Sequence, residues 1–193
     1  KTHPETMGRI KKSRTTYTNK QASIGLFRLM KMFGGDVAHV EMMFSSQLKW
    51  EDIRNKHVIF IGSVKTLQFL KPTLEKAGLI YDLEHSSFKY QTADSTLFFD
   101  NRSENYLNRE YSSLIHLCTN DKRKILFLLS DDDLGNIAAM KYLMDEKNTR
   151  FPQTFPDLNY KAVFEVKGRE STDFVVNLVR IDPIHENISE IWP

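Results

Sequence analysis

The sequence predicts an α/β fold, a Rossmann-like three-layer sandwich in which helices flank a mixed sheet. Two short runs of branched and aromatic residues, at 57–61 and 124–129, are typical of strands buried on both faces. A segment with helical spacing of apolar residues follows each run, as expected for parallel core strands joined by right-handed crossovers. Two later runs, at 162–167 and 174–181, predict a hairpin and therefore an antiparallel extension of the sheet.

The other expected elements follow in chain order. In the first half we expect strands at 9–14 and 37–43, a helix from the N-cap Thr18 to Gly34, and helices at 50–54 and 66–76. In the second half we expect short strands within 88–100 joined at 93–95, a polar loop at 101–108, a strand at 111–119, a helix at 134–144 and a loop at 151–157.

The length supports one sizeable hydrophobic core. The chain has 193 residues, of which 40% are hydrophobic and 27% charged, as in ordinary folded proteins. We expect a single α/β domain over 9–183, a tail or linker at 1–8 and a C-terminal tail at 184–193. Because the chain begins with Lys1 rather than methionine, we expect it to be part of a longer protein.

Charge and cysteine content restrict the class of partner. The 27 basic and 25 acidic residues nearly balance, so we expect nucleic-acid binding only through an upstream domain. Basic residues do crowd 9–20, where they predict either a solvated leader or an anion-binding footprint. No apolar run approaches the roughly 20 residues of a membrane span. The single cysteine, Cys118, excludes an intrachain disulfide and favours a cytoplasmic location.

Three turns at predicted strand ends are the candidate ligand sites, because ligands of open α/β sheets gather at the carboxyl ends of the strands. Small residues there let a backbone approach a ligand, hydroxyls supply hydrogen bonds, and cations attract an anion. The candidate residues are Arg14, Thr15 and Thr16 in the first corner, Gly62, Ser63, Lys65 and Thr66 in the second, and Ser130, Gly135 and Asn136 in the third.

Each corner also has a plainer interpretation. The second corner predicts phosphate or carboxylate recognition, or else an ordinary turn with a capping serine. In the third corner, Asp131 and Asp133 are candidate ligands of a divalent metal such as Mg²⁺, or else acidic residues that stabilise a helix start. No phosphate-loop, dinucleotide, zinc-protease or nucleophile-elbow motif is present, so no cofactor is assigned.

Two segments carry a resemblance to a known group of proteins. The stretch 48–63, a short acidic helix leading into a buried strand that ends in Gly-Ser, resembles a segment of uncharacterised bacterial proteins. The stretch 124–143, a buried strand followed by Gly135 and an alanine-containing helix, resembles a later segment of the same proteins. The resemblance spans most of 14–181 and implies a C-terminal α/β domain downstream of a winged-helix or other regulatory module, with no activity to carry over.

Three hypotheses about function follow. The first is a non-catalytic sensor or regulatory domain that binds a small anionic metabolite or nucleotide across the three corners. The second is a metal-dependent enzyme acting on a phosphorylated or nucleotide substrate, with Asp131 or Asp133 holding the metal. The third is a protein-interaction domain, for example one that forms a homodimer.

Overall fold

A computed structural model describes residues 41, 43, 48–66, 68–104, 107–131, 133–145, 147–148, 157–170 and 173–192. Several expectations fall outside these residues. They are the tail at 1–8, the strand at 9–14, the helix that begins at Thr18, most of the strand at 37–43, and the first corner with Arg14, Thr15 and Thr16.

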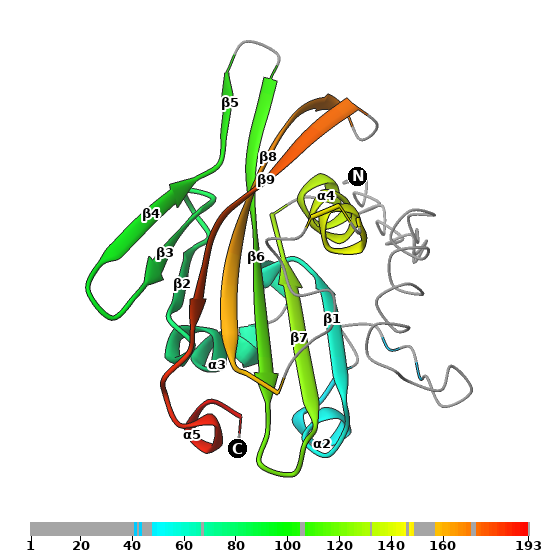
Figure 1. Cartoon of the computed structure of the whole chain (residues 1–193), viewed down its shortest axis with the longest axis vertical. Helices are drawn as coiled ribbons and strands as arrows, with labels where there is room; N and C mark the ends of the chain where they lie inside the picture. The colour runs from blue at the N-terminus through cyan, green and yellow to red at the C-terminus, as the bar shows by residue number, and fades with distance from the viewer. Residues whose placement is uncertain are drawn as a thin grey trace, which may run out of the picture.

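A six-stranded mixed sheet forms the centre of the molecule (Figure 1). The strand order is β1-β7-β6-β8-β9, and β5 pairs with β6 beside this path. Only the β1–β7 contact is parallel among the described strands; the other pairs are antiparallel. The bounds are β1 (Val58–Gly62), β5 (Arg102–Glu104), β6 (Leu107–Cys118), β7 (Lys124–Leu129), β8 (Tyr160–Glu170) and β9 (Asp173–Pro183).

Smaller elements cover the two faces of this sheet (Figure 1). One face packs against α4 (Asp133–Met144). The other face packs against a three-stranded antiparallel sheet and three short helices. These elements are β2 (Leu79–Asp82), β3 (Ser87–Gln91), β4 (Thr96–Asp100), α2 (Trp50–Ile53), α3 (Lys71–Lys76) and α5 (Ile188–Ile191), and the 3₁₀ turns η2 (Val64–Thr66) and η3 (Gln68–Leu70) precede α3.

Strand β7 shows why the core needs a continuous apolar run. Alternate residues of a strand point to opposite faces, and here both faces are covered. Phe127 belongs to the cluster beneath the small sheet, whereas Leu126 and Leu128 belong to the cluster beneath α4. The prediction of a doubly buried strand at 124–129 is therefore confirmed.

The C-terminal segment contributes to the first of these clusters. Ile184, Ile188, Ile191 and Trp192 are all buried there. The Trp192 ring lies 4.7 Å from the Trp50 ring and 5.8 Å from the Phe127 ring, measured between centroids. Residues expected to form a tail thus pack onto α2 and the sheet.

The predicted fold class is wrong. The described chain is mostly β, with a mixed sheet and a separate antiparallel sheet, and not a Rossmann-like three-layer α/β sandwich. The described residues between β1 and β2 form no long helix: α3 begins only at Lys71, with Pro72 in its first turn, and the chain then forms the small sheet. The polar stretch at 101–108, expected to be a loop, instead forms β5 and the start of β6.

None of the helices in the described ranges is both long enough and apolar enough to cross a membrane.

Candidate functional site

The carboxyl ends of β1 and β7 lie side by side. Gly62 is paired with Leu129, and the Ser130 N–H donates to the Gly62 carbonyl oxygen at 3.2 Å. Because the two strands are parallel, the turns that leave them start at the same edge of the sheet. The second and third predicted corners therefore adjoin, and we call residues 62–66 together with Ser130 and Asp131 the β1–β7 corner.

The turn after β1 uses its own hydroxyls. Ser63 Oγ accepts a hydrogen bond from the Lys65 N–H at 3.2 Å. The Ser63 carbonyl accepts from Thr66 Oγ1 at 2.8 Å and from the Thr66 N–H at 3.0 Å. These bonds are those of a capped turn, which satisfies its own backbone groups. Lys65 differs from its neighbours, because its side chain is 49% exposed and projects its charge toward solvent.

The turn after β7 holds a fixed carboxylate. Asp131 Oδ2 accepts from Asn101 Nδ2 at 2.9 Å, and Asn101 Oδ1 in turn accepts from the Tyr111 N–H at 2.8 Å. The amide of Asn101 is thereby anchored on both sides, so it orients Asp131. Asp131 Oδ1 lies 3.9 Å from Lys65 Nζ, which is the outer limit of an ion pair.

A shallow depression adjoins Asp131. Its lining residues are Tyr81, Ser86, Ser87, Phe88, Asn101, Tyr111 and Asp131, and it has no room for a bound water inside it. Tyr81 forms a hydrogen bond with Ser113, and burial raises the pKa of the Tyr81 phenol well above its usual range, with the nearby Asp131 charge adding to the shift. Tyr81 therefore stays protonated at neutral pH and serves as a hydrogen-bonding group rather than a base.

The first turn of α4 already holds a carboxylate. The Gly135 N–H donates to Oε2 of the buried Glu110 at 2.9 Å. A Cβ at position 135 would lie 2.7 Å from Ser130 Cβ and 2.8 Å from Glu110 Cδ. Gly135 was predicted to let a ligand approach the backbone, but in the structure it accommodates Glu110 and Ser130. One backbone N–H of the first turn of α4 is thus bound by a carboxylate of the same chain, at a helix end that favours negative charge.

Asn136 is buried beside this turn. Its Oδ1 accepts no hydrogen bond from the described residues. A buried acceptor that lacks a donor costs about 1–3 kcal/mol relative to a satisfied one. Among the described residues of the third corner, Asn136 therefore keeps an acceptor, Oδ1, that has no donor.

The metal ligands stay a prediction. Asp131 has Asn101 and Lys65 beside its two oxygens, and the side chain of Asp133 lies outside the described residues. Across the part of the chain that the structure describes, no three His, Cys, Asp or Glu side chains gather as a metal site would require.

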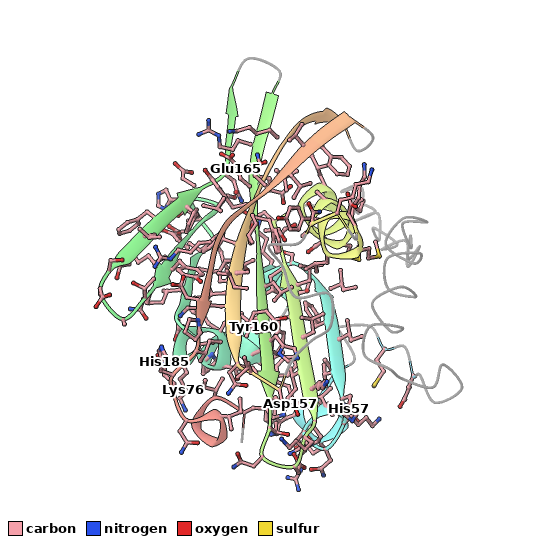
Figure 2. The ribbon with its side chains drawn as sticks, in the orientation of Figure 1. His57, Lys76, Asp157, Tyr160, Glu165 and His185 are labelled. Carbon is pink, nitrogen blue, oxygen red and sulfur yellow. The ribbon has the colours of Figure 1, made fainter. Side chains whose placement is uncertain are left out.

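Two further charged groups lie at opposite ends of the sheet (Figure 2). Near the β5–β6 hairpin, Glu165 pairs with Lys167 at 2.8 Å and with Arg109 at 3.5 Å. At the far end, Asp157 lies 3.5 Å from Lys122 Nζ and 3.8 Å from Cys118 Sγ. Burial, followed by the charge of Asp157, raises the pKa of the Cys118 thiol, so the reactive thiolate is disfavoured there.

Sequence reasoning missed four residues of this region: Tyr81, Asn101, Glu110 and Ser113. They come from the small sheet, the β4–β5 connection and β6, and only tertiary pairing brings them to the corner. Comparisons with protein-family models, with curated proteins and with solved structures give no match to this chain.

Proposed function

We propose that this chain is a non-catalytic binding domain of a sensor or regulatory protein, and that it takes a small anionic ligand, a metabolite or nucleotide, at the β1–β7 corner. The observation that carries the proposal is the position of Lys65. Its half-exposed ammonium stands over the edge where two parallel strands end, beside a depression lined by oriented polar groups.

The surrounding chemistry favours binding over turnover. Tyr81 is held protonated, and Ser113, with which it shares a hydrogen bond, is fully buried. Each group has the other as its hydrogen-bond partner, which favours a structural or hydrogen-bonding role over that of a nucleophile. A cytoplasmic location is part of the proposal, because Cys118 is the single cysteine of the chain.

Thermal-shift measurements with inorganic phosphate, nucleotides and sugar phosphates test this function. A ligand that binds only the native state raises its stability according to concentration and affinity. We expect a shift that Lys65→Ala abolishes. Lys71→Ala is the matched control, because Lys71 is 50% exposed and also carries one long ion pair, yet it lies on α3. Equal shifts in the two variants, or no shift with any of these anions, would refute the proposal.

A protein-interaction role is the second candidate, and β9 is the observation that favours it. Among the described strands β9 pairs with β8 alone, so its outer edge presents unpaired backbone groups. Val175, Val179 and Ile181 are 61%, 47% and 37% exposed along it. Light scattering of the wild type and of Val179→Lys tests this role: a homodimer that the lysine converts to monomer supports it, and a monomeric wild type opposes dimerisation.

A further inference from the structure

The β1–β7 corner presents two opposite charges to solvent, and they differ in freedom. Asp131 is 14% exposed and is held by Asn101, whereas Lys65 is 49% exposed and extends from a short 3₁₀ turn. At 3.9 Å their contact is long for an ion pair. The structure therefore has one fixed anion and one cation that can move away from it at little cost.

A purely anionic ligand would use only half of this arrangement. It would pair with Lys65, but the negative charge of Asp131, 3.9 Å from that ammonium, would weaken its binding. A purely cationic ligand would meet the reverse problem, since Lys65 would repel it. A ligand with both charges avoids either repulsion by inserting between the two side chains.

We propose that the ligand of this corner is a small zwitterion whose primary ammonium lies next to a carboxylate, as in a free α-amino acid. Its ammonium donates to Asp131 and its carboxylate accepts from Lys65, so one long ion pair is exchanged for two charge-assisted hydrogen bonds. Because Asn101 already orients Asp131, little freedom is lost at that end on binding.

The depression limits where the rest of the ligand lies. It cannot hold even a water, and of the two charged residues only Asp131 lines it, so the ligand lies outside the depression with its remaining atoms toward solvent. Selection at this corner then depends on the charged head of the amino acid more than on its side chain. This inference rests on the anion site proposed at Lys65 and extends it: the ligand keeps an anionic group for Lys65 and adds an ammonium for Asp131.

The test uses the twenty standard α-amino acids as probes in thermal-shift and calorimetric titrations of the full chain. The best binder is then compared with its carboxamide, which keeps the ammonium and lacks the carboxylate, and with its N-acetyl derivative, which has the reverse loss. We expect each derivative to bind at least about tenfold more weakly, because each loses a charge-assisted hydrogen bond. This comparison uses the unaltered protein, so it does not depend on whether a variant folds.

Two variants locate the effect. Asp131→Asn, checked for folding by circular dichroism, and Lys65→Ala should each abolish amino-acid binding, while Lys71→Ala should leave it unchanged. The zwitterion proposal is overturned if an N-acetyl derivative or phosphate binds as tightly as the free amino acid and binds equally well to Asp131→Asn. That outcome would still support an anion site at Lys65. A chain that responds to no amino acid and to no anion overturns both.

Discussion

The backbone N–H of Gly135 donates to the buried carboxylate of Glu110, so the first turn of α4 is bound to strand β6 of its own chain. This contact fixes how closely α4 approaches the sheet. It also occupies one backbone N–H of the helix start, whereas the half-exposed Lys65 supplies a cation to the corner. Several expected outcomes depend on close contacts of this kind.

Gly135→Ala should destabilise the protein by about 2–3 kcal/mol, because the added methyl overlaps two buried neighbours. The new Cβ would lie 2.7 Å from Ser130 Cβ and 2.8 Å from Glu110 Cδ. Urea denaturation measures the loss. Gly62→Ala is the matched control, since its Cβ would meet only the Phe60 ring at 3.2 Å, and we expect a clearly smaller change there. Equal effects of the two substitutions would contradict the role given to Gly135.

Ser86→Gly should stabilise the protein by about 0.5–1 kcal/mol, because Ser86 has a φ of 49° and glycine adopts that conformation without strain. The control is Lys122→Gly. Lys122 has a φ of 66° and lies in the β6–β7 turn, away from the depression that Ser86 lines. Both variants should unfold at higher urea concentrations than the wild type. If Ser86 contacts the ligand, only Ser86→Gly should also weaken ligand binding.

Acid should destabilise the protein between about pH 6.5 and pH 4 through His116. Burial lowers the pKa of this imidazole to about 4, although the Leu158 carbonyl that faces Nδ1 at 2.9 Å acts in the opposite direction. The unfolded chain takes up the proton near pH 6.5 and the native chain only near pH 4, so stability falls as pH decreases through this window, by roughly 3 kcal/mol in all.

Equilibrium unfolding at successive pH values measures this slope. His116→Gln should flatten it, because glutamine does not titrate. His85→Gln serves as the control, since His85 is exposed and its Nδ1 lies 2.9 Å from Asp82 Oδ2. A slope that persists in His116→Gln would assign the acid sensitivity to other groups.

Gly78 and Lys161 should show energetic coupling. Gly78 has a φ of 81°, and a Cβ there would lie 2.2 Å from Nζ of the buried Lys161, which donates to the Ala77 carbonyl at 2.8 Å. Gly78→Ala should therefore cost about 2–3 kcal/mol. In a Lys161→Leu background the contact with Nζ is absent, and the backbone strain and a 3.2 Å contact with the Gln91 carbonyl oxygen remain, so the cost should fall to about 1–2 kcal/mol. Purely additive losses would refute the coupling.

The sequence predicted those elements whose apolar pattern is local. The runs at 57–61 and 124–129 became β1 and β7, and the helix expected at 134–144 is α4. β7 is buried on both faces, as its continuous pattern predicted. β1 is the outer strand of the described order and its residues are only half-buried, although they pack onto both core clusters, so the expectation of full burial at 57–61 is wrong. Parallel core strands were expected, but their order was not; the structure pairs β1 with β7, which joins two of the predicted corners.

The fold class could not be predicted because it depends on pairings that no local pattern encodes. The polar stretch at 101–108 has no apolar alternation, yet it forms β5 and the start of β6 by pairing across a hairpin. Asn101 reaches Asp131 only through that pairing, so the group that orients the predicted carboxylate was invisible in the sequence. Likewise Glu110, whose carboxylate accepts the Gly135 N–H in the first turn of α4, lies on β6, 25 residues before Gly135 in the chain.

The packing of Trp192 on Trp50 has a spectroscopic consequence. These are the only two tryptophans in the chain, and their rings lie 4.7 Å apart with their planes inclined by 52°. Two indoles this close couple excitonically, so the folded chain should give a paired positive and negative band in circular dichroism. Since one indole precedes β1 and the other ends the described chain, the band requires α2 and the C-terminal segment to have come together.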